Sequence, residues 1–306
     1  MMQLTIVHET RYDYTPVVET AHHMACLQPM RTAHQAPQSH QLDIEPAPAQ
    51  QNAHQDVFGN HRVFFNLLAP HDSLRVTATS TVQTMPAGTL RPSAAWEVVR
   101  QAMAYASDKA YMAASEFVFA SPHIQPHADF AAYAMPSFTK GADLALAAQD
   151  LMQRMHRDFT YASQSTEINT PALQALHQRR GVCQDFAHIF IACLRSLGLP
   201  ARYVSGYLLT QPPPGKPRLI GSDASHAWAS VHLLDAHGEP MGWLDLDPTN
   251  NRSGLGTPGE DYVTLAWGRD YADISPMRGV IQGGNSHQLK VAVTVMPTSE
   301  HQAKPQ

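Results

Sequence analysis

Long apolar runs are absent from this chain of 306 residues. One of the longest candidates, 189–194, is far shorter than the roughly 20 residues that a helix needs to cross a bilayer. The segment Met1–Tyr14 alternates polar and apolar residues, so it lacks the continuous apolar core of a signal peptide. We therefore expect a soluble, cytoplasmic protein with no membrane partner.

Positive charge is also scarce. Lysine and arginine total 21 against 26 acidic residues, and the formal net charge is -5 at pH 7. No basic run exceeds a pair such as Arg179-Arg180, whereas a nucleic-acid-binding surface needs a basic patch or stripe. We expect no nucleic-acid partner.

Cysteine occurs only three times, as Cys26, Cys183 and Cys193. An odd, sparse set is typical of a reducing compartment and argues against a disulfide framework. The spacing of Cys183 and Cys193 does not match a zinc knuckle, and no calcium loop of the D-x-D-x-D-G type is present. We expect neither a metal nor an organic cofactor.

The pattern of the chain changes near its first third. The first ninety or so residues alternate apolar and polar positions, which predicts a β-rich, sandwich-like N-terminal domain over residues 1–88. Past the linker Pro86–Pro92 the apolar residues recur at helical spacing. We therefore predict a catalytic domain over 89–296 and a polar tail over 297–306.

The sequence pattern of the second domain predicts a helix followed by an antiparallel sheet. A helix is predicted from Cys183 to Leu197, where Gly198 and Pro200 end it. Strand-like runs follow at 201–209, 225–234 and 242–246, and a last alternating strand lies at 289–295. This order predicts the α+β class.

Cys183 has the position expected of a nucleophile. The unpaired amides and the dipole of a helix N-terminus stabilise a thiolate there. Cys193, in mid-helix on the apolar face, is instead predicted to be core. A thiolate nucleophile needs a base and a group that orients the base. His226 opens one predicted strand and Asp247 ends the next, so the two are expected side by side.

The chain resembles the bacterial transglutaminase-like family. The segments that carry the resemblance are Gly181–His188, Ala201–Tyr207, Ser225–Trp228, Asp247–Asn251 and Gly268–Asp273. The resemblance covers nearly the whole chain, including the β-rich N-terminal region. It implies a papain-like cysteine triad with Cys183, His226 and Asp247 at the matching positions.

Two details of this resemblance bear on the site. Asp245 competes with Asp247 for the third role, and strand alternation puts both on one face. The family pattern has the aspartate four residues after the tryptophan, which favours Asp247. Relatives usually carry glutamate after His-Ala-Trp-Ala, but here the position is Ser230.

Accessory residues are assigned with alternatives. The oxyanion of an acyl-transfer intermediate needs a second donor besides the nucleophile's own N–H, and Tyr161 or Gln184 is a candidate. Asp185 is expected to cap the catalytic helix. Arg202 is expected to pair with Asp185 or another buried acid. Trp228 is expected either to wall the site or to pack in the core.

The expected function is cysteine-dependent acyl transfer on a peptide or carboxamide through a thioester. Hydrolysis of a peptide or isopeptide bond is the first expectation, because water is always available. Protein-glutamine transamidation uses the same triad and is the first alternative. A binding or scaffold module that kept the fold without activity is the second. Members of the family occur alongside proteins resembling peptide ligases, which implies a peptide or protein substrate and a peptide-ligase-like partner.

Overall fold

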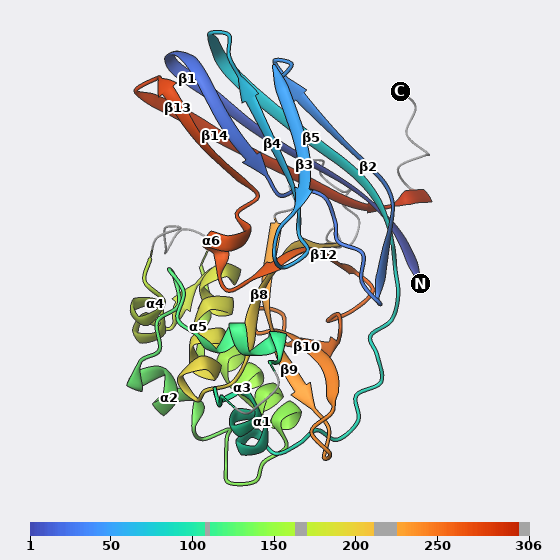
Figure 1. Ribbon diagram of the computed structural model, residues 1–306, viewed down its shortest axis with the longest axis vertical. Coiled ribbons are helices and arrows are strands. Elements are labelled where there is room, and N and C mark those ends of the chain that lie inside the picture. Colours follow the sequence, from blue (N-terminus) through green and yellow to red (C-terminus); the bar gives the residue numbers. More distant parts are fainter. Residues whose placement is uncertain (108–110, 163–169, 211–224, 300–306) are drawn as a thin grey trace.

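The computed structural model describes residues 1–107, 111–162, 170–210 and 225–299. Figure 1 shows a strand-rich part above and, below it, a second sheet covered by helices. The α+β class expected from the sequence is confirmed.

The strand-rich part is one antiparallel sheet in the order β2-β5-β1-β4-β3, to which β13 and β14 are also joined through β1. Its strands are β1 (Met2–Ala25), β2 (Gln35–Glu45), β3 (Gln50–Gln55), β4 (His61–Leu67), β5 (His71–Thr84), β13 (Met277–Gly283) and β14 (Ser286–Pro297). The first half of β1 lies between β14 and β5, and its second half lies between β13 and β4. β1 therefore holds this sheet together.

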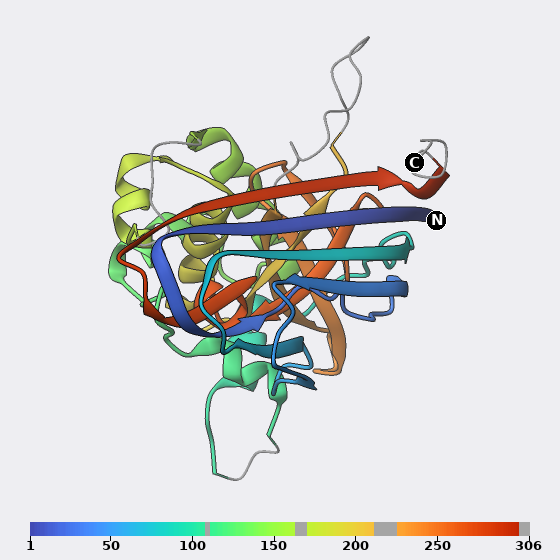
Figure 2. The same ribbon diagram turned by 90° about the horizontal axis from the view of Figure 1, so that it is seen from above.

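Two features of this part differ from the sequence-based prediction. The strands form one sheet linked through β1, although apolar side chains of β4 and β5 still pack into one cluster as in a sandwich. The chain also returns to this sheet at its end, because β13 and β14 pair with β1 and not with the second sheet. Residues 277–296, predicted to lie in the catalytic domain, thus belong to the N-terminal sheet. Figure 2 shows β1 and β14 running alongside each other.

The second sheet holds the expected strands of the catalytic region, in the order β11-β10-β9-β8-β12. They are β8 (Ala201–Leu208), β9 (Ser225–Leu234), β10 (Pro240–Asp247), β11 (Arg252–Leu255) and β12 (Tyr262–Gly268). The helix α5 (Cys183–Ser196) packs across β8 and β9. Because side chains alternate along a strand, Ala227 and Ala229 face α5 while His226 and Trp228 lie on the opposite face of β9.

The remaining helices surround α5 and complete its core. They are α1 (Trp96–Met103), η1 (Ala113–Val118), α2 (Ala128–Ala134), α3 (Leu144–Asp158), α4 (Ala172–Gln178) and α6 (Tyr271–Ile274). β6 (Thr160–Tyr161) and β7 (Arg180–Gly181) form a short parallel pair, and β7 lies directly before α5. α5 is buried along most of its length, which fixes the position of its first residue.

The two sheets are joined along β12, the edge strand of the second sheet. The Gln35 side chain donates to the Thr264 carbonyl at 2.6 Å and accepts from its N–H at 2.7 Å. Asn60 makes the same pair of hydrogen bonds to Trp267, at 2.8 and 2.9 Å. Each amide therefore satisfies backbone groups that an edge strand leaves unpaired.

Candidate active site

The N-terminus of α5 presents Cys183, which is partly exposed. Asp185 caps this end, since its Oδ2 accepts from the Val182 N–H at 2.8 Å. The cap requires glycine at position 181, because an added Cβ would lie 2.6 Å from the same carboxylate. The sequence Gly181-Val182-Cys183 thus gives a tight entry into the helix and leaves the first amides near the sulfur.

His226 reaches the sulfur from the start of β9. It lies opposite Gly206 of β8 in the strand register. The Trp228 ring is stacked beside the imidazole, at 6.0 Å between centroids and 30° between planes. A Cβ on Gly206 would lie 2.6 Å from the Trp228 ring, so glycine at this position makes room for the indole. Trp228 is fully buried and both walls the site and packs the core.

Asp247 lies at the end of β10 with none of its surface exposed. Its Oδ2 accepts hydrogen bonds at 2.7 Å each from His226 Nε2, Tyr262 OH and Asn250 Nδ2. Its Oδ1 accepts from the backbone N–H groups of Thr249, at 2.9 Å, and Asn250, at 3.3 Å. A buried carboxylate with this many donors is held ionised and in one orientation.

The electrostatics favour a protonated imidazole at His226 beside an ionised Asp247. Burial lowers the pKa of His226, but its hydrogen bonds to Asp247 and Cys183, with their charges, raise that pKa to about 10. Burial raises the pKa of Asp247, yet the donors, His226 foremost, bring it below 3.8. Because Asp247 holds Nε2, the other ring nitrogen, Nδ1, is the one available to the sulfur. The structure thus brings Cys183, His226 and Asp247 together.

Tyr161 and Gln184 are the two predicted candidates for the second oxyanion donor. Tyr161 of β6 pairs with Gly181 and is 54% exposed. Burial and the charge of Cys183 raise the pKa of its phenol. Gln184 follows Cys183 in the first turn of α5 and is partly buried.

The remaining cysteines have the environment of core residues. Burial raises the pKa of the Cys26 thiol to about 11, and burial raises that of Cys193 further still. Neither thiol is ionised near neutral pH, so Cys183 is the cysteine placed for reaction.

Two residues of the site were not assigned from the sequence. Tyr262 comes from β12, beyond a loop, and no periodicity connects it to Asp247. Asn250 was visible only as part of the Asp-Pro-Thr-Asn-Asn motif, and its position in the turn after β10 lets its amide reach back to Asp247.

Asp245 is not the acid that contacts His226, and Arg202 does not contact Asp185. Asp245 is buried two residues before Asp247 and accepts a hydrogen bond from Ser230, so it is separate from the imidazole. Arg202 makes no pair with Asp185. Its guanidinium lies between the rings of Trp243 and Trp267, and Asp245 is the acid whose charge it feels.

Within residues 1–107, 111–162, 170–210 and 225–299, no group of three or more His, Cys, Asp or Glu side chains is arranged to hold a metal ion. In the same part of the chain no helix has the length and apolar character needed to cross a membrane.

Two family models match the sequence. Residues 4–83 match the bacterial transglutaminase-like N-terminal region, and residues 132–248 match the transglutaminase-like superfamily. A Mycobacterium tuberculosis protein of uncharacterized function is 39% identical over 301 residues, which cover 95% of this chain and 92% of the relative. A Mycobacterium leprae protein, also uncharacterized, is 30% identical over 298 residues, covering 96% and 99%.

Two further comparisons concern proteins with more informative names. A Pseudomonas aeruginosa protein-glutamine gamma-glutamyltransferase is 30% identical over 108 residues, which are 34% of this chain and 15% of that protein. A crystal structure from Cytophaga hutchinsonii, named as a "Putative Cysteine Protease", superimposes with a TM-score of 0.72 at 21% identity and covers 97% and 90% of the two chains. This last likeness concerns the fold.

Proposed function

Because this chain belongs to the transglutaminase-like superfamily, we propose that it hydrolyses an amide bond of a peptide or protein through a thioester on Cys183. The observation that carries the proposal is the position of His226, which is hydrogen-bonded to Cys183 on one side and to Asp247 on the other. This arrangement supplies a nucleophile, a proton carrier and a fixed orienting carboxylate.

The reaction follows from these positions. The Cys183 sulfur attacks the carbonyl carbon, and the negative charge on the oxygen is stabilised by the Cys183 N–H and the Tyr161 hydroxyl. The C–N bond then breaks, and the His226 imidazolium gives its proton to the leaving amine. Water attacks the thioester with neutral His226 as its base, which releases the carboxylic acid and restores the imidazolium–thiolate pair.

Transamidation is the second candidate, and the match to the Pseudomonas aeruginosa glutamyltransferase favours it. It differs in the second step alone, where a primary amine takes the place of water at the same thioester. A peptide-ligase-like partner remains a prediction for either reaction.

The test is mass spectrometry of a glutamine-containing peptide library incubated with the protein, with and without a primary amine. Hydrolysis predicts cleaved peptides, or loss of ammonia with uptake of water, in wild type and none with Cys183→Ala. Detection of amine-adducted peptides would show that the reaction is transamidation and not hydrolysis. If no product depends on Cys183 and a thiol-directed electrophile labels Cys183→Ala as well as wild type, the catalytic proposal is wrong and the scaffold alternative stands.

A further inference from the structure

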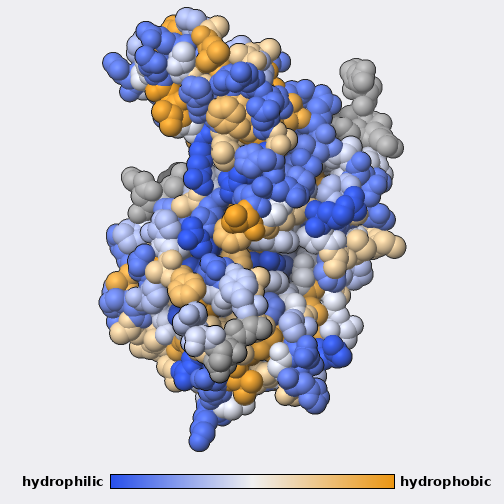
Figure 3. Space-filling view, viewed as in Figure 1, coloured by the Kyte–Doolittle hydropathy of each residue, from blue (hydrophilic) through white to orange (hydrophobic). Residues whose placement is uncertain are grey.

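A large cavity lies between the N-terminal sheet and the catalytic sheet. Its volume is about 1170 Å³, and none of the proposed triad lines it. The space-filling view of Figure 3 shows the surface hollowed where the strand-rich part meets the lower part. His232 of β9 lines the cavity six residues after His226, and Trp243 of β10 lines it four residues before Asp247. At about 3.3 Å per residue, the cavity wall therefore lies roughly 13–20 Å along the strands from the triad.

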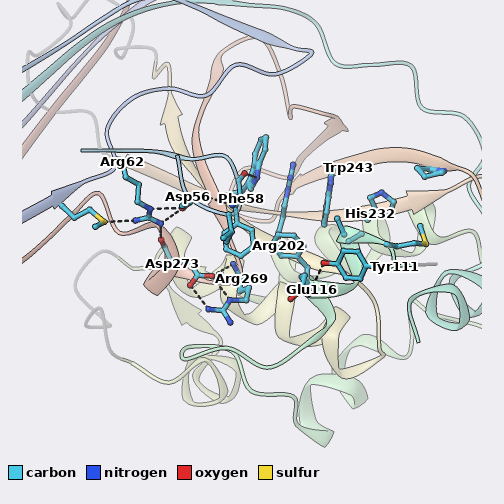
Figure 4. Close-up of a pocket in the computed structure, with 18 of the residues that line it drawn as sticks. Asp56, Phe58, Arg62, Tyr111, Glu116, Arg202, His232, Trp243, Arg269 and Asp273 are labelled. Carbon is cyan, nitrogen blue, oxygen red and sulfur yellow. Dashed lines mark hydrogen bonds and ion pairs between the residues drawn. The ribbon is translucent and has the colours of Figure 1, made fainter. Parts of the chain in front are cut away.

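Arg202 is the unusual residue of this cavity. Its guanidinium lies 4.2 Å from the ring centre of Trp243 and 4.0 Å from that of Trp267 (Figure 4). The residue is only 8% exposed, and its Nε is buried with no hydrogen-bond partner in the described part of the chain. Burial lowers the pKa of Arg202 to about 10, which still leaves it charged at neutral pH. A largely buried cation whose Nε has no hydrogen-bond partner is costly, so its presence needs a reason.

The nearest acid does not neutralise Arg202 directly. Arg202, Ser230 and Asp245 lie opposite one another on three adjacent strands, with Ser230 in the middle. Two strand spacings separate the backbones of Arg202 and Asp245 by about 10 Å. Among the described residues no ion pair within 4.0 Å involves Arg202, and the Ser230 hydroxyl donates to Asp245. Ser230 thus stands between Arg202 and Asp245 on the sheet and bonds to the acid.

Two other arginines of the cavity are paired with acids. Arg62 pairs with Asp56 at 2.7 Å, and Arg269 pairs with Asp273 at 2.9 Å. Figure 4 shows Arg62 and Asp56 to the left of Arg202, with Asp273 and Arg269 below them. Much of the remaining wall is aromatic: Phe58, Phe117, Trp243 and Trp267.

A planar guanidinium held between two indoles is preorganised for a bidentate carboxylate, because little side-chain freedom is lost on binding. Glu116 accepts a hydrogen bond from the Tyr111 hydroxyl and adds a negative charge to the wall. This charge disfavours ligands that carry several negative charges. The cavity therefore suits one carboxylate joined to an apolar body.

We propose that this cavity binds an organic monocarboxylate with an aromatic or apolar body, whose carboxylate is held by Arg202 and whose body lies against the aromatic wall. A peptide C-terminus ending in an apolar residue and a free aromatic acid share this chemistry. The site is independent of the reaction at Cys183.

The test is calorimetric titration of the full chain with N-acetylphenylalanine and, as a neutral match, N-acetylphenylalanine amide. The acid is expected to bind at least about tenfold more tightly than the amide. Cys183→Ala should keep this preference, which separates the cavity from the catalytic centre. Tripeptides ending in phenylalanine, free or amidated, identify the occupant: tighter binding than the acetylated amino acid favours a peptide C-terminus, and weaker binding favours a free acid.

Three variants test the role of Arg202. Arg202→Met should abolish the acid preference, and Ser230→Glu should do the same by supplying an internal carboxylate without removing the arginine. Arg278→Met, which removes an exposed arginine of the same cavity, should leave the preference unchanged. Equal binding of acid and amide to wild type, no binding of either at millimolar concentration, or an unchanged preference in folded Arg202→Met would overturn the proposal.

Discussion

Replacing Asp247 by asparagine is the most informative perturbation of the triad, because it keeps the shape and changes the charge. Asparagine can keep its oxygen toward the two backbone N–H groups that contact Oδ1. Its NH₂ group then faces the atoms that now donate to Oδ2, and His226 Nε2 must become an acceptor. The imidazole proton moves to Nδ1, where it faces Cys183 and blocks uptake of the thiol proton.

The size of the effect follows from the lost charge-assisted hydrogen bond. Such a bond contributes about 1.5–3 kcal/mol, which converts to a roughly 10- to 150-fold smaller population of the thiolate–imidazolium pair. The rate of Cys183 alkylation by iodoacetamide at neutral pH, followed by intact mass, should fall by this factor. Cys26 and Cys193 serve as internal controls, since burial raises the pKa of both thiols and keeps them unreactive.

The same substitution has a signature in stability against pH. The pKa of His226 rises on folding from 6.5 to about 10, so its contribution is complete below about pH 6.5 and is lost as the pH rises toward 10. The pKa of Asp247 falls on folding, so its contribution is present above 3.8 and is lost as the pH falls further. The stability gap between wild type and Asp247→Asn should thus be larger near about pH 5.5 than near about pH 9.5, as urea unfolding measures.

Asp245→Asn is the matched control, because Asp245 is an equally buried carboxylate two residues earlier in the same strand. Its alkylation rate should stay within about a factor of two of wild type, since a group that does not touch the imidazole leaves the ion pair intact. An Asp247→Asn protein that folds and is alkylated at the wild-type rate would refute the reasoning, as would equal losses from the two variants.

Two further outcomes follow from the same geometry. Tyr262→Phe removes one donor to Asp247 and should slow alkylation of Cys183 by roughly 2- to 10-fold, at the net value of about 1 kcal/mol for one hydrogen bond; an unchanged rate would show that the remaining donors suffice. Gly181→Ala places a Cβ 2.6 Å from the Asp185 carboxylate and should destabilise the fold by about 1–3 kcal/mol in thermal unfolding. Unaltered stability in Gly181→Ala would mean that the helix entry relaxes without cost.

Local patterns predicted much of the fold around the triad. The apolar spacing after Cys183 indicated the helix, and strand alternation indicated β8 to β10, because both periods reflect one buried face. The meeting of His226 with Asp247 followed from a short connection between β9 and β10, which forces neighbouring strands to pair. The elements that could be predicted from the sequence are therefore those held by contacts between residues close in sequence.

Distant contacts could not be read in the same way. Alternation over 289–295 predicted a strand but contained no information on its partner, and β14 pairs with β1 at the other end of the chain. The Tyr262 hydroxyl reaches Asp247 only because β12 lies next to β8 in the sheet order, which sequence spacing does not encode. Likewise the two indoles around Arg202 come from different strands, and their convergence depends on register.

The pairing of β1 with β14 also determines how the molecule responds to force. Leu4 lies opposite Pro297 and Thr15 opposite Ser286, so the start of β1 and the end of β14 lie at the same end of the sheet. Tension applied between these ends would load one hydrogen-bonded pair at a time, as in opening a zipper, and would not shear the whole strand at once. The region inserted between β5 and β13, which holds the proposed triad, would carry none of that load until β14 had been peeled away.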